Sequence, residues 1–286
     1  DQLCNVMTEL ISDDQKIMAA KQVFSALVDR YSKLNNSDMM KLGTHLLEKT
    51  PQKQYFEVEF AKTKETMAEV YSAKGDYYTA AKLLSEIKFD SPNLKYSDDD
   101  KLDRYCQICE FYFECDDATG AEDYVYKAMN LAEKTIKREL KLRFEVSYAR
   151  IMDSNRKFLL AAPKYHWISK QEGVDEENLM ALLDCGVICA ILASAGPERS
   201  AILSNLYNDE RTKRLETSDI LTKMYLDRIV TREDIEKFEK KLSKHHKALT
   251  GDGLTVLEKA YIEHNIVAVS KVYETISYQT LGDILQ

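Results

Sequence analysis

Apolar residues recur every three or four positions along most of this chain. The pattern is clearest after residues 12–15, Ser-Asp-Asp-Gln, which can form a capping box at the start of a helix. The apolar stripe that follows consists of Ile17, Ala20, Val23, Phe24, Leu27, Val28 and Tyr31. This spacing predicts an amphipathic helix of about five turns with one buried face.

The same start signal precedes other apolar stripes. Ser97 is followed by three aspartates, and Thr231 lies three residues before Asp234. A hydroxyl cap followed by carboxylates suits the positive end of a helix dipole. The chain has only 9 Gly and 4 Pro, and no segment alternates between apolar and polar residues as a strand would. We therefore predict an all-α fold of about thirteen or fourteen helices.

Three segments share one arrangement, in which an aromatic residue, a short polar break and a small residue follow each other. Alanine holds the small position at 80, 121 and 161, so the spacings are 41 and 40 residues. A period near 40 with helix–turn–helix content is typical of a solenoid, and it exceeds the tetratricopeptide period of about 34. We expect a right-handed solenoid of antiparallel, tetratricopeptide-like repeats, in which Ala81, Ala121 and Ala161 allow close helix packing.

Composition and charge restrict the class of protein. The 286 residues are 44% hydrophobic, which suffices for a sizeable core in about two structural units. The formal charge of −8 disfavours nucleic acid and suits a basic protein partner. No segment reaches the roughly 18 continuous apolar residues of a membrane span, and no signal peptide is evident. The start at Asp1, without Met, indicates that the natural N-terminus is missing.

Cysteine and histidine provide the candidate chemistry. Cys106 and Cys109 form a CxxC, with Cys185 and Cys189 as a distant second pair. A zinc site needs four ligands at suitable spacing, whereas helical spacing also places thiols on a buried face, which we favour in a reducing compartment. The histidines show no HxxxH or HExxH pattern; they are His45, His166, His245, His246 and His264. We therefore expect no catalytic residue, cofactor or metal.

The most basic stretch is residues 237–247, and acidic residues at 233, 234, 236 and 239 dilute its charge. An exposed helix face with ion pairs is the favoured interpretation, and a binding patch is the alternative.

From residue 145 onward, several short sequence stretches are specific enough to point to a known family. They occur at residues 146–150, 156–158, 191–200, 208–211, 223–229 and 257–265. This run, which reaches residue 285 and covers about half of the chain, closely resembles the subunit 4 family of the COP9 signalosome, a branch of the PCI-domain proteins.

The resemblance implies a helical-repeat arm over residues 1–195 and the start of a PCI domain over 196–286, whose winged helix is cut short. It implies a non-catalytic scaffold in the complex that removes a ubiquitin-like modifier from cullins. Expected partners are other signalosome subunits and the cullin–RING-box ligase, without nucleic acid, membrane or obligate homo-oligomer. The expected location is cytoplasmic and nuclear. Motif residues with expected structural roles are Arg199, Asp209, Arg211, Asp227 and Arg228.

Three other functions remain open. The equivalent proteasome-lid subunit shares the architecture, and a PCI protein that binds nucleic acid through a winged helix belongs to a different class. A hydrolase without a recognisable motif is the third.

Overall fold

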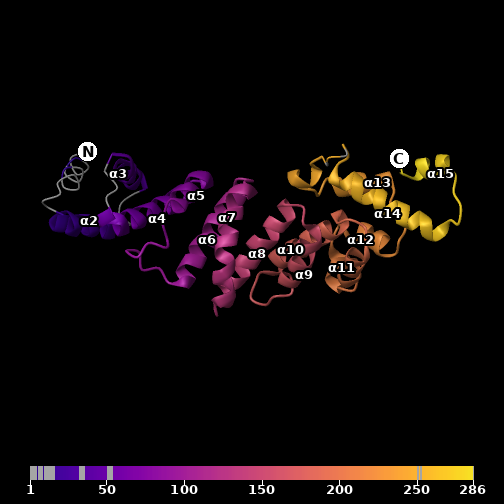
Figure 1. The fold of residues 1–286 in the computed structure, drawn as a ribbon, viewed down its shortest axis with the longest axis horizontal. Coiled ribbons are helices and arrows are strands. Elements are labelled where there is room, and N and C mark those ends of the chain that lie inside the picture. Colours follow the sequence, from indigo (N-terminus) through magenta and orange to yellow (C-terminus); the bar gives the residue numbers. More distant parts are fainter. Residues whose placement is uncertain are drawn as a thin grey trace. The chain divides into compact units, whose positions relative to one another are not determined.

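A computed structural model describes residues 17–31, 36–49, 54–249, 251 and 253–285, together with residues 5 and 9. The capping box predicted at residues 12–15 lies outside this part. Every regular element of the described chain is a helix (Figure 1), and one isolated backbone bridge joins Leu249 to Thr255. The predicted all-α fold is confirmed. None of the described helices combines the length and apolarity needed to cross a membrane.

The chain divides into two compact units, residues 1–144 and residues 145–286. The predicted division at residue 195 rests on the resemblance and stays a prediction. The helices before the boundary are α2 (Ile17–Tyr31), α3 (Asn36–Lys49), η2 (Gln54–Phe56), α4 (Glu57–Ala73), α5 (Tyr77–Ser85), α6 (Asp98–Glu114) and α7 (Ala118–Lys134), and α8 (Arg138–Ser154) contains the boundary. Those after it are α9 (Phe158–Ile168), α10 (Glu176–Leu192), α11 (Pro197–Tyr207), η3 (Glu210–Arg214), α12 (Ser218–Tyr225), α13 (Arg232–Glu239), η4 (Lys244–Lys247), α14 (Val256–Val272) and α15 (Tyr278–Leu285).

The apolar stripe of α2 packs into an aromatic cluster in the first unit. The ring of Phe24 lies 5.3 Å from that of Phe60 and 5.9 Å from that of Phe56, and all three side chains are buried. Tilted and edge-to-face aromatic pairs of this kind add to the apolar surface buried. Val23, which the predicted stripe included, is 44% exposed. Adjacent residues of a helix point about 100° apart, so Val23 is turned away from the face that buries Phe24.

The predicted repeat appears as three helix hairpins with the same turn. Each first helix ends in a left-handed residue, namely Gly75 (φ 82°), Asp116 (φ 57°) or Arg156 (φ 58°). In each, the left-handed residue donates to a carbonyl three residues back, and the next residue donates to one five residues back. This is the Schellman motif, which satisfies the last carbonyls of a helix. The residue that completes it also caps the next helix, so the turn is as short as these two motifs allow.

The repeated alanines stand at equivalent places in these hairpins. The amides of Ala80, Ala121 and Ala161 donate to the carbonyls of the three cap residues, Asp76, Asp117 and Lys157. All three side chains are fully buried. Ala81 follows Ala80 by one residue, so it corresponds to Ala162 of the third hairpin, and both are also fully buried. Small residues at these positions allow close packing within a hairpin, and α4 contacts α5 and α6 contacts α7 along their lengths.

Replacement of Ala121 by leucine should overpack the α6–α7 pair and lower the free energy of unfolding by about 1–3 kcal/mol. Urea denaturation of the two chains measures this difference. The matched control is Asn130→Leu, because Asn130 is exposed on the same helix. Equal stability of the two variants would contradict the packing that we assign to Ala121.

A glycine sets the distance between α9 and α10 in the second unit. A Cβ at Gly186 would lie 3.2 Å from Cβ of Tyr165 and 3.4 Å from the carbonyl oxygen of Ala162. Residues around it on α10 form a continuous buried segment, since Val187, Ile188, Cys189, Ala190 and Ile191 are all buried. The helix is therefore apolar on nearly every side, as expected for one at the centre of a unit.

Three of the described cysteines occupy buried helix faces. Cys106, Cys109 and Cys189 are buried, and burial raises the pKa of Cys106 to about 12. A thiol in this state is protonated at neutral pH and behaves as a small apolar side chain. No described cysteine belongs to a group of three or more side chains placed to hold a metal ion.

Candidate protein-binding site

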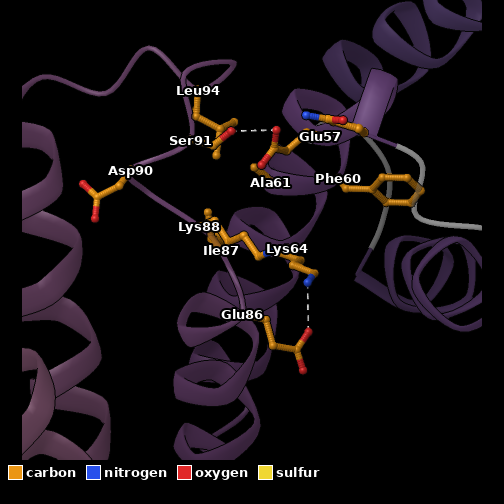
Figure 2. Close-up of a pocket in the computed structure, with 11 residues that line it drawn as sticks. Glu57, Phe60, Ala61, Lys64, Glu86, Ile87, Lys88, Asp90, Ser91 and Leu94 are labelled. Atoms are coloured by element: carbon orange, nitrogen blue, oxygen red, sulfur yellow. Dashed lines mark hydrogen bonds and ion pairs between the residues drawn. The ribbon is translucent and has the colours of Figure 1, made fainter.

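A cleft in the first unit lies between α4 and the segment that joins α5 to α6 (Figure 2). It has a volume of about 660 Å³. Its floor contains the buried apolar residues Phe60, Ala61, Ile87 and Leu94. Charged side chains surround this floor; they are Glu57, Lys64, Glu86, Lys88 and Asp90.

Polar contacts across the cleft hold the joining segment against α4. Lys64 Nζ donates to Glu86 Oε2 over 2.9 Å, and the lysine is almost completely buried. Ser91 Oγ and Asn93 Nδ2 both donate to Glu57 Oε2 over 2.8 Å (Figure 2 shows Ser91 facing Glu57). The cleft therefore has walls that are fixed before any partner arrives, which reduces the entropy lost on binding.

A second contact set fastens the end of the same segment. Tyr96 Oη donates to Glu65 Oε1 over 2.9 Å, and Arg104 Nε lies 3.0 Å from the same oxygen. Burial and the neighbouring Glu65 carboxylate raise the pKa of Tyr96 well above its usual value, so its hydroxyl stays protonated and donates.

The chemistry of the cleft suits binding. Its described lining contains neither histidine nor cysteine, and its only serine donates to Glu57. Lys64 and Glu86 form an ion pair beside this floor. An apolar floor with a charged rim is the usual anatomy of a pocket that receives one apolar side chain of a protein partner.

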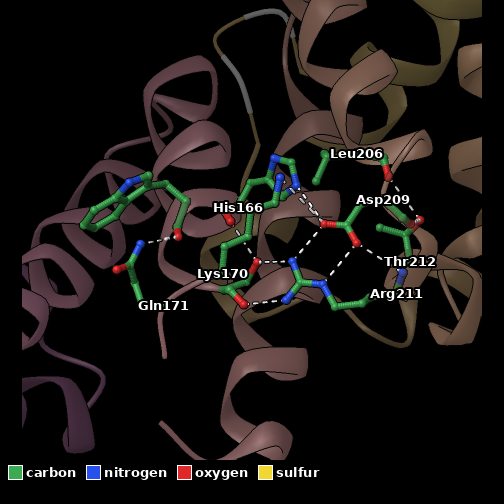
Figure 3. A network of polar contacts seen from close by, with 9 residues as sticks. His166, Lys170, Gln171, Leu206, Asp209, Arg211 and Thr212 are labelled. Atoms are coloured by element: carbon green, nitrogen blue, oxygen red, sulfur yellow. Dashed lines mark hydrogen bonds and ion pairs between the residues drawn. The ribbon is translucent and has the colours of Figure 1, made fainter. Parts of the chain in front are cut away.

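Asp209 and Arg211, two of the residues singled out from the sequence, belong to one polar cluster in the second unit (Figure 3). Arg211 donates to both oxygens of Asp209, from Nε over 3.0 Å and from Nη2 over 2.8 Å. His166 Nε2 lies 3.0 Å from Asp209 Oδ2. Arg211 also donates from Nη2 to Ser169 Oγ over 3.1 Å. The cluster thus fastens η3 to the end of α9 and has a structural role.

The charges within this cluster follow from its geometry. Hydrogen bonds from Arg211, opposed by burial and supported by His166, hold the pKa of Asp209 well below its usual range. Burial lowers the pKa of His166 in spite of the adjacent carboxylate. At neutral pH, His166 is therefore uncharged and donates its Nε2 hydrogen, while Arg211 carries the compensating charge.

Replacement of Asp209 by asparagine should lower the free energy of unfolding by about 2 kcal/mol at pH 7, because Arg211 loses a bidentate partner. The folded pKa of Asp209 is depressed, so its stabilisation is present above the unfolded pKa of about 3.9 and is lost as pH falls below it. Urea denaturation at pH 7, 5 and 3 should therefore show the two chains converging in acid. A difference that is the same at every pH would mean that the carboxylate charge is not responsible.

Arg199 lies at the junction of α10 and α11 and is 3% exposed. Its Nε donates to the carbonyl of Ala190 over 3.1 Å, and its Nη2 donates to that of Ile191 over 2.9 Å. These carbonyls belong to the last turn of α10, where no helical amide is available. Arg199 therefore caps the end of that helix.

Asp227 and Arg228 occupy the turn after α12. Asp227 has a left-handed backbone (φ 51°), and this turn repeats the Schellman motif of the three hairpins. The carboxylate of Asp227 pairs with Lys271 of α14, while the carbonyl of Arg228 lies 2.8 Å from His264 Nε2. The pairing of Asp227 is thus with α14, and not with its neighbour in sequence.

The basic stretch at 237–247 forms ion pairs on a surface. Lys241 pairs with Glu216, and Lys247 lies 4.0 Å from Glu239. The ion pairs agree with the favoured interpretation, but the stretch is not one exposed helix face, because it spans the end of α13 and the separate helix η4, in which His246 is buried.

Comparison with known proteins identifies the family. The model of the family described as "PSMD12/CSN4, N-terminal" matches residues 1–177. A COP9 signalosome complex subunit 4 from Emericella nidulans is 38% identical over all 286 residues, which span 70% of that relative. The chain belongs to the COP9 signalosome subunit 4 family.

Relatives from other kingdoms support the same family. COP9 signalosome complex subunit 4 of Arabidopsis thaliana is 36% identical over 96% of the chain, and that of Drosophila melanogaster is 35% identical over 96%. The matched regions span 72% of the Arabidopsis protein and 68% of the Drosophila protein. Within this family, the cleft lies in the region that the family model matches, whereas the Asp209 cluster joins His166 and Ser169 of that region to Asp209 and Arg211 beyond it.

One cluster in this subunit 4 family member escaped the sequence analysis. Asp153 lies beside His245 and His246, although the aspartate and His246 are 93 positions apart. The spacing of the histidines along the chain does not reveal this cluster, because its third member is a carboxylate on a distant helix. Two adjacent histidines were the only local signal.

Proposed function

We propose that this chain is a non-catalytic scaffold subunit of a COP9 signalosome and that it helps the complex to recognise cullin–RING ligases. The 38% sequence identity to the Emericella nidulans COP9 signalosome complex subunit 4, over all 286 residues, carries the proposal. Helical repeats commonly serve as protein-binding surfaces, and the three hairpins are of this kind. Its site of action is the cytoplasm and nucleus.

Affinity purification of the tagged, full-length natural protein from its own organism tests the scaffold role. We expect the other signalosome subunits to co-purify in near-stoichiometric amounts. Recovery of proteasome-lid proteins, or of no complex, would overturn this part of the proposal. The matched control is a tagged chain of the same size from an unrelated helical-repeat protein.

We place ligase recognition in the cleft of the first unit. In this proposal, the apolar floor receives a side chain of the cullin or RING-box protein, and the rim residues set its orientation. Binding is then relayed to the catalytic subunits through the assembled complex. The formal charge of −8 favours a basic partner and implies that salt weakens the association.

Titration of this chain against a purified cullin–RING-box heterodimer tests the site. Asp90→Lys reverses an acidic charge at the cleft rim, and Glu69→Lys reverses an exposed acidic charge on α4 outside the cleft lining. We expect Asp90→Lys to weaken binding to a basic partner about tenfold, since one charged contact is worth roughly 1.4 kcal/mol at an interface, and Glu69→Lys to leave it nearly unchanged. Equal effects of the two variants would remove the cleft from the proposal.

A further inference from the structure

Asp153, His245 and His246 come from two elements of the second unit. Asp153 belongs to the last turn of α8, and the histidines are consecutive residues of the short helix η4. The ring of His246 packs 5.9 Å from that of Phe158, and Asp153 and His246 are both buried. The side chain of His245 is 33% exposed. Solvent therefore reaches the group from the side of His245.

The distances within this group match the edges of a metal coordination shell. Asp153 Oδ1 lies 2.8 Å from Nε2 of His246 and 3.4 Å from Nε2 of His245, and the three atoms lie within 4.8 Å of one another. A tetrahedral zinc ion with bonds of about 2.0–2.1 Å has ligands about 3.3 Å apart. Small side-chain movements would bring all three atoms into contact with one ion.

His245 supplies the observation that points to a ligand. Its Nε2 atom is buried and has no hydrogen-bond partner among the described residues. If this nitrogen carries a hydrogen, the 3.4 Å separation from Asp153 is too long for a good hydrogen bond. If it carries a lone pair, it faces a carboxylate oxygen. A cation between the two atoms satisfies both, and a bound ion is one explanation for a buried polar atom without a partner.

His246 has a metal-free explanation that binding must overcome. Its Nδ1 accepts a hydrogen bond of 3.3 Å from the amide of Ser243, so its Nε2 carries the hydrogen that is donated to Asp153. Metal binding at Nε2 moves this proton to Nδ1 and breaks the bond from Ser243. That bond is long and weak, while imidazole–metal bonds are strong, so the exchange favours the metal.

We propose that Asp153, His245 and His246 bind one divalent transition-metal ion, with zinc as the best match, and that this ion ties η4 to α8. Imidazole and carboxylate ligands suit zinc, and three protein ligands leave a fourth position for water. The carboxylate is already ionised, because the two imidazoles hold the pKa of Asp153 well below its usual range against the effect of burial.

A calorimetric titration of the chelator-treated chain with zinc tests this site. We expect one equivalent to bind and to raise the thermal unfolding temperature. His245→Gln should weaken binding at least about tenfold, since it removes a ligand. The metal-free variant should still fold, because the side chain of His245 is 33% exposed. Asp153→Asn should also abolish the binding.

His166→Gln is the matched control, because His166 pairs with Asp209 in the same unit without a third ligand. Its zinc affinity should equal that of the unchanged chain. The absorption spectrum of the cobalt(II)-loaded chain, recorded in the near ultraviolet and visible, separates this site from the cysteines. Thiolate ligands give intense charge-transfer bands in the near ultraviolet, and nitrogen and oxygen ligands do not. Thiolate bands, no stoichiometric binding, or equal binding by His245→Gln would overturn the proposal.

Discussion

Replacement of Asn265 by aspartate is expected to lower the free energy of unfolding by at least about 3 kcal/mol at pH 7. Asn265 is fully buried on α14. Its Oδ1 accepts from the amide of Val230 over 2.9 Å, and its Nδ2 donates to the carbonyl of Val230 over 2.9 Å. Aspartate has the same shape, but it places a carboxylate oxygen against the Val230 carbonyl and buries a charge.

The pH dependence of this variant has a definite sign. Burial against a carbonyl raises the folded pKa of the new carboxyl above the unfolded value of about 3.9. The penalty is therefore present above that unfolded value and disappears as pH falls below it, where a protonated carboxyl donates to Val230 as the amide did. Urea denaturation at pH 7 and pH 4 measures the change.

The control for this experiment is Asn205→Asp, because Asn205 is exposed on α11. This variant should differ from the original chain by less than about 0.5 kcal/mol at both pH values. If Asn265→Asp behaved in the same way, the two hydrogen bonds to Val230 would not be important for stability.

Replacement of Arg199 by methionine is expected to cost about 3 kcal/mol. Methionine fills similar space, but it leaves the carbonyls of Ala190 and Ile191 buried without a donor, each at about 1–3 kcal/mol. It also removes a cation from the negative end of the α10 dipole. Burial lowers the pKa of the Arg199 guanidinium to about 10, so the group is charged at neutral pH.

Arg199→Lys provides a graded comparison. Lysine keeps the charge but lacks the planar fork that reaches both carbonyls, so its cost should lie between those of arginine and methionine. The control is Arg214→Met, because Arg214 is 73% exposed and its ion pair with Glu176 is exposed as well. Chemical denaturation should show the largest loss of unfolding free energy for Arg199→Met, a smaller loss for Arg199→Lys and the smallest for Arg214→Met. Equal stability of Arg199→Met and Arg214→Met would show that the capping contacts contribute nothing.

Local signals in the sequence were sufficient for the helices. The predicted starts at Ser97 and Thr231 are confirmed as capping boxes, in which each hydroxyl pairs with an acidic residue three positions on. Both partners lie within one turn, so no tertiary contact is needed to form them. The hairpin spacing was visible for the same reason, because each turn needs one left-handed residue, one cap and one small residue within six positions.

Partners of individual side chains could not be predicted in this way. The resemblance singled out Arg199 and Asp227, but the carbonyls that Arg199 caps and the lysine that pairs with Asp227 depend on how the helices pack. The candidate protein-binding cleft likewise joins Glu57 to Ser91, which are 34 positions apart. Spacing along the chain carries no information about such pairs.

The sequence by itself thus determined the helical class, the hairpin period and the helix starts, because propensity, capping and apolar periodicity act over a few residues. The tertiary structure decided which polar groups meet, including the cleft in the first unit and the group of Asp153, His245 and His246. These contacts depend on the close packing of helices, which fixes side chains to within a fraction of an ångström and joins residues far apart in the chain.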